Sequence, residues 1–130
     1  METSQRRKIL VVEDEADLVA YLKTVLADHG FDVICAEDGV EGIAKARSEH
    51  PDLITLDINL PRETGVRMYR DLHEDPATAA IPVVMITGVS PEFKRFIETR
   101  KQVPPPAGYF EKPVKPEELV AKIRQVLGQG

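Results

Sequence analysis

Five short runs of apolar or β-branched residues recur along the chain, and each is followed by a stretch with helical periodicity. The runs cover residues 8–12, 31–36, 53–56, 82–86 and 108–111. The first, third and fourth are almost wholly apolar, which is typical of parallel strands covered by helices on both faces. The run at 31–36 is more mixed in polarity and predicts an edge strand.

Apolar residues spaced three and four apart predict a helix after each strand. The first contains Leu18, Leu22 and Leu26 and stops near Gly30, where a helix commonly ends. The other four are predicted to begin after Asp38, near Gly65, at Ser90-Pro91-Glu92 and at Pro116. Five successive βα units predict a single α/β domain over residues 1–130, with a core over 8–127 and a tail at 1–7.

Composition and charge narrow the class of protein. A chain of 130 residues, 42% of them hydrophobic, can build a sizeable core without covalent staples. The single cysteine, Cys35, excludes an intrachain disulfide and a cysteine-based metal cage. A net charge of -5 argues against direct binding to nucleic acid or to an anionic membrane. The absence of a long apolar segment or secretion signal in the sequence predicts a cytoplasmic protein.

Charged and hydroxyl side chains follow the predicted strands at the edge where an open α/β sheet binds ligands. These residues are Glu13, Asp14 and Glu15 after the first strand, Asp57 after the third, Thr87 after the fourth and Lys112 after the fifth. Because the carboxyl ends of parallel strands meet at one edge of a sheet, we expect these groups to converge.

The converging groups fit one reaction. Clustered carboxylates repel one another unless a cation lies among them, and Mg²⁺, or Mn²⁺ in its place, is typically held by carboxylates and waters. Asp14 and Asp57 are the best direct ligands, and Glu13 fits a ligand that acts through water. A carboxylate beside Mg²⁺ can attack phosphorus. Lys112 and Thr87 can then stabilise the phosphoryl oxygens.

Each residue also has a simpler interpretation when it is taken alone. An acidic residue after a strand often only caps the next helix. Thr87 before Gly88 can be a turn hydroxyl, and Lys112 before Pro113 a solvated strand end. The functional interpretation rests on the joint placement of carboxylates, a hydroxyl and an ammonium at four strand ends.

Four spaced motifs resemble the receiver domain of two-component response regulators, a family that includes single-domain chemotaxis regulators. The motifs are ILVVEDE at 9–15, LITLDINLP at 53–61 followed by Gly65, VVMITG at 83–88 and YFEKPV at 109–114. The resemblance implies a flavodoxin-like, doubly wound five-stranded parallel sheet with strand order 2-1-3-4-5. It also implies five helices in three layers.

The resemblance assigns the phosphoryl acceptor and its metal site. Asp57 would accept the phosphoryl group, and Glu13, Asp14 and Asp57 would hold Mg²⁺. The backbone carbonyl of Asn59 would complete the set of protein ligands.

The resemblance also implies a switch. Thr87 and Lys112 would contact the phosphoryl oxygens, and the Lys112–Pro113 peptide would be cis. Tyr109 matches the aromatic residue that follows the movement of the threonine. The surface formed by the fourth helix, the fifth strand and the fifth helix would then change shape and bind a downstream protein, or a second phosphorylated copy of the chain.

The implied partner that supplies the phosphoryl group is a sensor histidine kinase or a histidine phosphotransfer protein. The chain would act as a signalling protein in a phosphorelay rather than as an enzyme, since it would catalyse only its own phosphorylation and slow autodephosphorylation.

The sequence departs from the common family pattern in three places. Glu13 stands where aspartate is commoner, and its longer side chain should still reach a metal-bound water. The segment from Thr87 to Lys112 is a few residues longer than usual and contains the prolines at 104–106. Val89 is apolar and cannot orient a hydrolytic water, so we expect a phosphoryl group that lasts longer than in fast chemotaxis regulators.

Three other functions compete with this interpretation. A flavodoxin-like cofactor binder needs a glycine-rich or hydroxyl-rich loop after the first strand, and the acidic residues at 13–15 have the wrong charge for a phosphate. A magnesium-dependent phosphatase needs a general acid two residues after its nucleophile, which Asn59 cannot provide. A degenerate receiver that binds partners without phosphorylation remains the alternative.

Overall fold

The computed structural model describes residues 6–57, 65–87 and 107–128. Five parallel strands form one sheet in the order β2-β1-β3-β4-β5, as the resemblance implies. The strands are β1 (Lys8–Val12), β2 (Asp32–Ala36), β3 (Leu53–Asp57), β4 (Val83–Thr87) and β5 (Gly108–Glu111). The mixed run is an edge strand, as predicted, and β5 forms the other edge.

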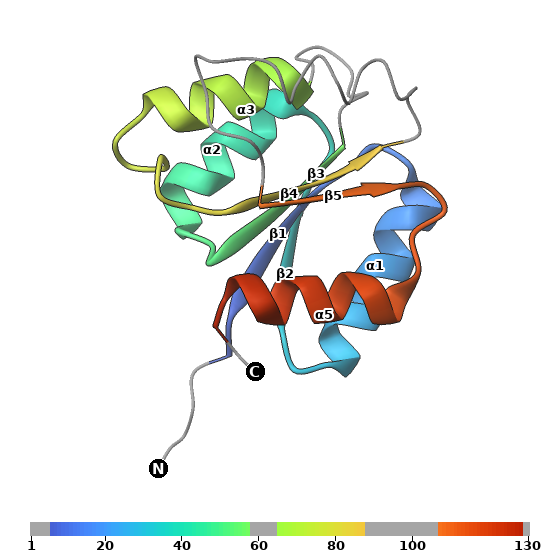
Figure 1. The fold of residues 1–130 in the computed structure, drawn as a ribbon. Helices are drawn as coiled ribbons and strands as arrows, with labels where there is room; N and C mark the ends of the chain where they lie inside the picture. Colours follow the sequence, from blue (N-terminus) through green and yellow to red (C-terminus); the bar gives the residue numbers. More distant parts are fainter. Residues whose placement is uncertain (1–5, 58–64, 88–106, 129–130) are drawn as a thin grey trace.

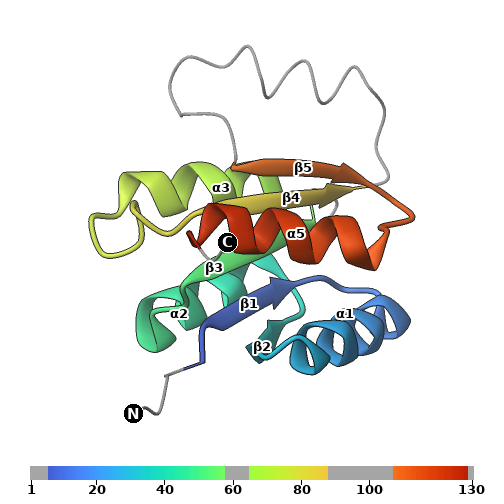
Figure 2. The same cartoon turned by 60° about the horizontal axis from the view of Figure 1, so that its bottom comes forward.

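The helices lie in two layers, one on each side of the sheet. Within the described ranges they are α1 (Ala16–Asp28), α2 (Gly39–Glu49), α3 (Gly65–Glu74) and α5 (Pro116–Val126). Figure 1 shows α1 and α5 below the sheet and α2 and α3 above it, and Figure 2 shows the same arrangement from another side. None of these helices has the length and apolar character needed to cross a membrane.

Each side of the sheet has its own hydrophobic core. Leu10, Ile54 and Met85 belong to the cluster on the side of α2 and α3, whereas Ile9 and Leu53 belong to the cluster beneath α1 and α5. Successive residues of a strand therefore enter opposite cores. This explains why β1 and β3 are apolar at nearly every position and why their ends are held in a fixed place.

The structure corrects two strand ends and leaves one helix untested. Asp57 and Thr87 were expected just after their strands, but each is the last residue of one, because the ladder continues to the pairs Asp57 with Ile86 and Thr87 with Glu111. Four helices occur in the described ranges instead of five. The helix predicted from Ser90 falls within 88–106, outside those ranges.

The start of α2 is stabilised by a side-chain cap. Asp38 is the N-cap residue, and its Oδ1 accepts a hydrogen bond of 2.8 Å from the Glu41 backbone N–H. Asp38→Ala removes this acceptor and is expected to lower the free energy of unfolding by about 1–2 kcal/mol. Urea denaturation measures the change, and Asp38→Ser, which keeps a capping oxygen, should retain most of the stability. Equal losses in the two variants would contradict the capping role.

Candidate functional site

Three described strands deliver the charged residues of the site to one edge of the sheet. Glu13 and Asp14 directly follow β1, Asp57 ends β3, and Lys112 directly follows β5. β1 and β3 are neighbours with Val12 opposite Leu56, so the acidic residues of these two strands come together. The convergence that the sequence predicted is confirmed for these four residues.

The acidic residues form a compact cluster. Glu13, Asp14 and Asp57 each offer a carboxylate oxygen, and the three oxygens lie within 4.8 Å of one another. Glu13 is 2% exposed and Asp57 is 3% exposed, whereas Asp14 is open to solvent. Burying two carboxylates side by side is unfavourable unless positive charge is close to them.

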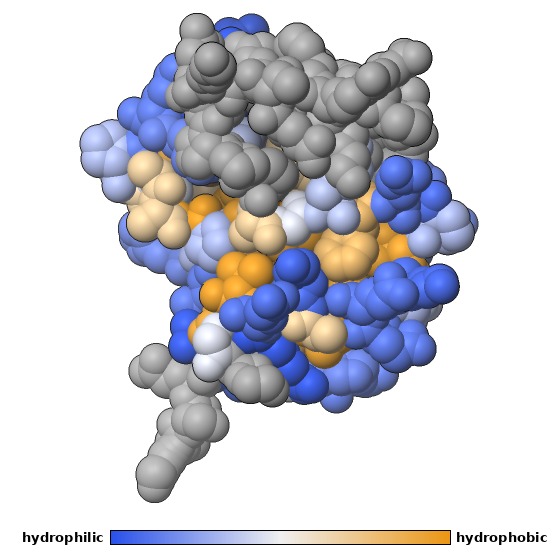
Figure 3. Space-filling model, viewed as in Figure 1, coloured by the Kyte–Doolittle hydropathy of each residue, from blue (hydrophilic) through white to orange (hydrophobic). Residues whose placement is uncertain are grey.

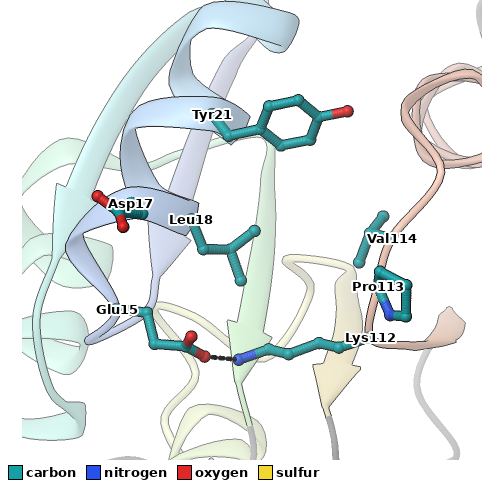
Figure 4. A pocket seen from close by; sticks show the side chains of 7 residues that line it. All are labelled: Glu15, Asp17, Leu18, Tyr21, Lys112, Pro113 and Val114. Atoms are coloured by element: carbon teal, nitrogen blue, oxygen red, sulfur yellow. Dashed lines mark hydrogen bonds and ion pairs between the residues drawn. The ribbon is translucent and has the colours of Figure 1, made fainter.

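Lys112 supplies positive charge to this cluster. Its Nζ lies 3.3 Å from Glu13 Oε1 and 3.2 Å from Asp57 Oδ2. A third ion pair of 2.5 Å joins it to Oε1 of Glu15, which is drawn in Figure 4. One side chain from the edge strand β5 therefore contacts residues that follow β1 and end β3.

The surroundings change the proton affinity of two groups. Burial raises the pKa of Glu13 from its ordinary value of 4.5 to about 7, and the charge of Asp57 adds to the rise, although the Glu15 backbone N–H and the charge of Lys112 oppose it. Burial acts to lower the pKa of Lys112, but the hydrogen bond to Glu15 and the charges of Asp57 and Glu13 outweigh it and raise that pKa. Lys112 is therefore charged at neutral pH, and its single positive charge faces the carboxylates of Glu13, Glu15 and Asp57.

The donor set fits a hard divalent cation. Carboxylate oxygens are the ligands that Mg²⁺ prefers, and the exposed Asp14 leaves one side of the cluster open to water, which Mg²⁺ usually retains. The raised pKa of Glu13 indicates that the folded cluster would gain from an added cation. Asn59, whose backbone carbonyl is the further implied ligand, lies outside the described residues.

Thr87 and Tyr109 lie on the two strands beyond β3. Thr87 is the last residue of β4, beside Glu111 of β5, and its side chain lies outside the described part of the chain. Tyr109 is opposite Met85 in the ladder, is half-buried and packs against the core on the side of α2 and α3. Its hydroxyl oxygen is buried. The implied cis peptide at Lys112–Pro113 is confirmed.

Glu15 has a contact that sequence reasoning did not assign. It is the N-cap residue of α1, but its side chain makes no capping hydrogen bond. It lies at the rim of a pocket with Leu18, Tyr21 and Val114, where Figure 4 shows its carboxylate directed toward Lys112. Its position two residues after Glu13 was the available signal, but the sequence does not specify which way so long a side chain turns.

Comparisons with known proteins agree with this geometry. The family model described as the response regulator receiver domain matches residues 9–124. The chain is 36% identical over 121 residues to the alkaline phosphatase synthesis transcriptional regulatory protein PhoP of Bacillus subtilis, which covers 93% of this chain and 48% of PhoP. It is 36% identical over 120 residues to the protein PilH of Pseudomonas aeruginosa, which covers 92% of this chain and 97% of PilH.

A solved structure shows the same fold. The CheY-like response regulator receiver domain protein of Methanospirillum hungatei superposes with a TM-score of 0.84 at 28% identity, and the match covers 96% of each chain. The chain thus spans about half the length of PhoP and nearly all of PilH.

Proposed function

Because the chain belongs to the response regulator receiver domain family, we propose that it receives a phosphoryl group on Asp57 and relays a signal through the resulting change of its surface. The observation that carries the proposal is the placement of Asp57. Its carboxylate is 3% exposed, ends a buried strand, and has an ammonium 3.2 Å from Oδ2 and two further carboxylates beside it.

The proposed reaction is a transfer between an activated donor and a carboxylate. An Asp57 oxygen attacks phosphorus and forms an O–P bond, while the bond from phosphorus to the donor breaks and its electron pair stays with the donor. A phosphohistidine donor then takes a proton from solvent at the freed nitrogen, and acetyl phosphate leaves as acetate. Lys112 offsets negative charge on the phosphoryl oxygens during the transfer, and Thr87 is proposed to donate a hydrogen bond to one of them.

We propose Mg²⁺ as the cofactor, with Mn²⁺ as a substitute. Asp14 and Asp57 would bind it directly, Glu13 would bind it through water, and the carbonyl of Asn59 would complete the protein ligands. When bound, the ion would neutralise charge that builds up on the phosphoryl oxygens. The protein contributes the fixed spacing of the carboxylates, because β1 and β3 are held rigidly between the two cores.

The proposed output is a change at the edge of the sheet formed by β5. Thr87 and Lys112 would move toward the phosphoryl group, and Tyr109 would follow into the space that the threonine leaves. In the view of Figure 3, apolar residues reach the surface between β5 and α5 and are framed by hydrophilic ones. This surface is suited to a downstream protein or a second phosphorylated copy.

The partners proposed for the chain are proteins. A sensor histidine kinase or a histidine phosphotransfer protein would donate the phosphoryl group, and the net charge of -5 disfavours direct contact with nucleic acid. PhoP is named as a transcriptional regulatory protein, and the chain matches about half of it. We propose a cytoplasmic signalling role without turnover of a separate substrate.

Intact-mass measurement tests the function directly. The chain incubated with acetyl phosphate and Mg²⁺ is expected to gain the mass of one phosphoryl group, and EDTA should prevent the gain because the cluster then lacks its cation. Hydroxylamine should remove the added group, since it cleaves acyl phosphates. An unchanged mass with Mg²⁺ present would support the alternative of an interaction module that is not phosphorylated.

A further inference from the structure

The ammonium of Lys112 is shared among three carboxylates in the described structure. Its Nζ lies 3.3 Å from Glu13, 3.2 Å from Asp57 and 2.5 Å from Glu15. A lysine ammonium has three N–H donors. Three carboxylates therefore match its whole donor capacity, and a phosphoryl oxygen that needs a hydrogen bond from Lys112 must displace one of them.

The three contacts differ in how readily they can be given up. Glu13 and Asp57 are 2% and 3% exposed, so removing the lysine from either would leave a buried carboxylate with less compensating positive charge and little water to solvate it. The Glu15 side chain is 60% exposed, and water can solvate its carboxylate once Lys112 leaves. The contact with Glu15 is therefore the least costly of the three to break.

The position of Glu15 is not explained by a role in the helix. An N-cap residue commonly uses its side chain to bind a backbone N–H of the first turn, which Glu15 does not do. Its carboxylate lies instead at the rim of the pocket of Figure 4, across from Pro113 and Val114, with Lys112 as its ion-pair partner. Glu15 thus shares the Lys112 ammonium with the proposed acceptor Asp57 without belonging to the proposed metal ligands.

We propose that Glu15 is a positioning residue that holds Lys112 in the unphosphorylated protein and yields it to the phosphoryl group. This inference rests on the proposed function, because it takes Asp57 as the acceptor. Breaking the contact with Glu15 opposes phosphorylation, so Glu15 sets how readily the site accepts a phosphoryl group. Its negative charge beside Lys112 also repels an anionic donor, and that effect must be separated from the hold on Lys112.

Glu15→Gln is the informative variant, and Asp17→Asn is its matched control. Asp17 lines the same pocket, and its substitution removes the same charge, but the ion pairs of Lys112 in the described structure do not include it. With acetyl phosphate and saturating Mg²⁺, Glu15→Gln is expected to be phosphorylated about two- to fivefold faster than the wild type, the range for loss of an exposed ion pair. The faster phosphorylation of Glu15→Gln should persist in about 0.5 M salt, where longer-range charge effects are screened. Asp17→Asn should match the wild type there.

A second measurement follows Lys112 itself in metal-free protein. A ¹H–¹⁵N spectrum of the lysine ammonium groups gives a Lys112 signal, identified by its loss in Lys112→Arg, and this signal should shift in Glu15→Gln but not in Asp17→Asn. If the wild type takes up a phosphoryl group but the Lys112 signal does not shift in Glu15→Gln, the role of Glu15 is overturned and the proposed function stands. The same holds if both variants are phosphorylated faster than the wild type to an equal extent in high salt. A wild type that takes up no phosphoryl group while the signal shifts would overturn the proposed function instead.

Discussion

Asp57→Asn is expected to abolish phosphoryl incorporation. Asparagine has nearly the same shape as aspartate, but its amide oxygen carries no full negative charge and does not attack phosphorus as a carboxylate does. Glu41 and Glu49 also lie near a lysine ammonium, but the group of three acids that could hold a metal ion in the described residues does not include them, so they should not replace Asp57. Intact mass after incubation with acetyl phosphate and Mg²⁺ should show one added group on the wild type and none on the variant.

The control for this experiment must separate chemistry from folding. Asp17→Asn makes the same chemical change near the site and should still be phosphorylated. Asp57→Asn should fold normally, because it removes one of two adjacent buried charges and leaves Lys112 with Glu13 and Glu15. Circular dichroism and the urea midpoint check this. A folded Asp57→Asn protein that gains the same mass as the wild type would show that another residue is the acceptor.

Glu13→Gln is expected to change the pH dependence of stability in metal-free protein. The pKa of Glu13 is raised to about 7 by burial in the folded state, against about 4.5 for an ordinary glutamate in the unfolded chain. Between these values the folded state holds a proton that the unfolded state has lost. The wild type therefore loses stability as the pH rises through this window, and the loss is complete above about pH 7. Glutamine does not titrate and lacks this loss.

Urea denaturation at pH 5 and pH 8 in the presence of EDTA measures the effect. The free energy of unfolding of Glu13→Gln minus that of the wild type should increase by on the order of 2–3 kcal/mol from the lower to the higher pH. Asp17→Asn serves as the control for the general effect of one acidic charge. A difference between Glu13→Gln and the wild type that stays constant with pH would contradict the raised pKa.

The strands were predictable from the sequence because burial on both faces leaves a pattern that few other structures share. Ile9–Val12 and Leu53–Leu56 are apolar at nearly every position, which is what two covering helical layers require. The ends were less predictable. Asp57 and Thr87 interrupt the apolar pattern, yet their backbones continue the ladder because a neighbouring strand still lies beside them.

The sequence predicted in part which residues form the site, but it did not predict how burial changes their pKa values. Glu13, Asp57 and Lys112 come together because parallel strands end at the same edge, which requires only the order of elements. Glu13 and Asp14 are adjacent acids in the sequence, but Asp14 is exposed whereas Glu13 is buried, and burial raises the pKa of Glu13. Such differences depend on how the first turn after β1 is oriented. The direction in which the long side chain of Glu15 turns is likewise not specified by the sequence.

Because Lys112 follows an edge strand, its ion pairs affect how easily that strand separates from the sheet. Among the described strands β5 has a neighbour on one side only, and edge strands fray more readily than central ones. Lys112 follows this strand yet contacts Glu13 after β1 and Asp57 on β3, so it fastens the edge to the middle of the sheet. Fraying of β5 would therefore withdraw the ammonium from the acidic cluster. Conversely, the negative charge that the proposed phosphorylation would add at Asp57 would hold Lys112 more firmly, so local unfolding of β5 would become less frequent in the phosphorylated protein.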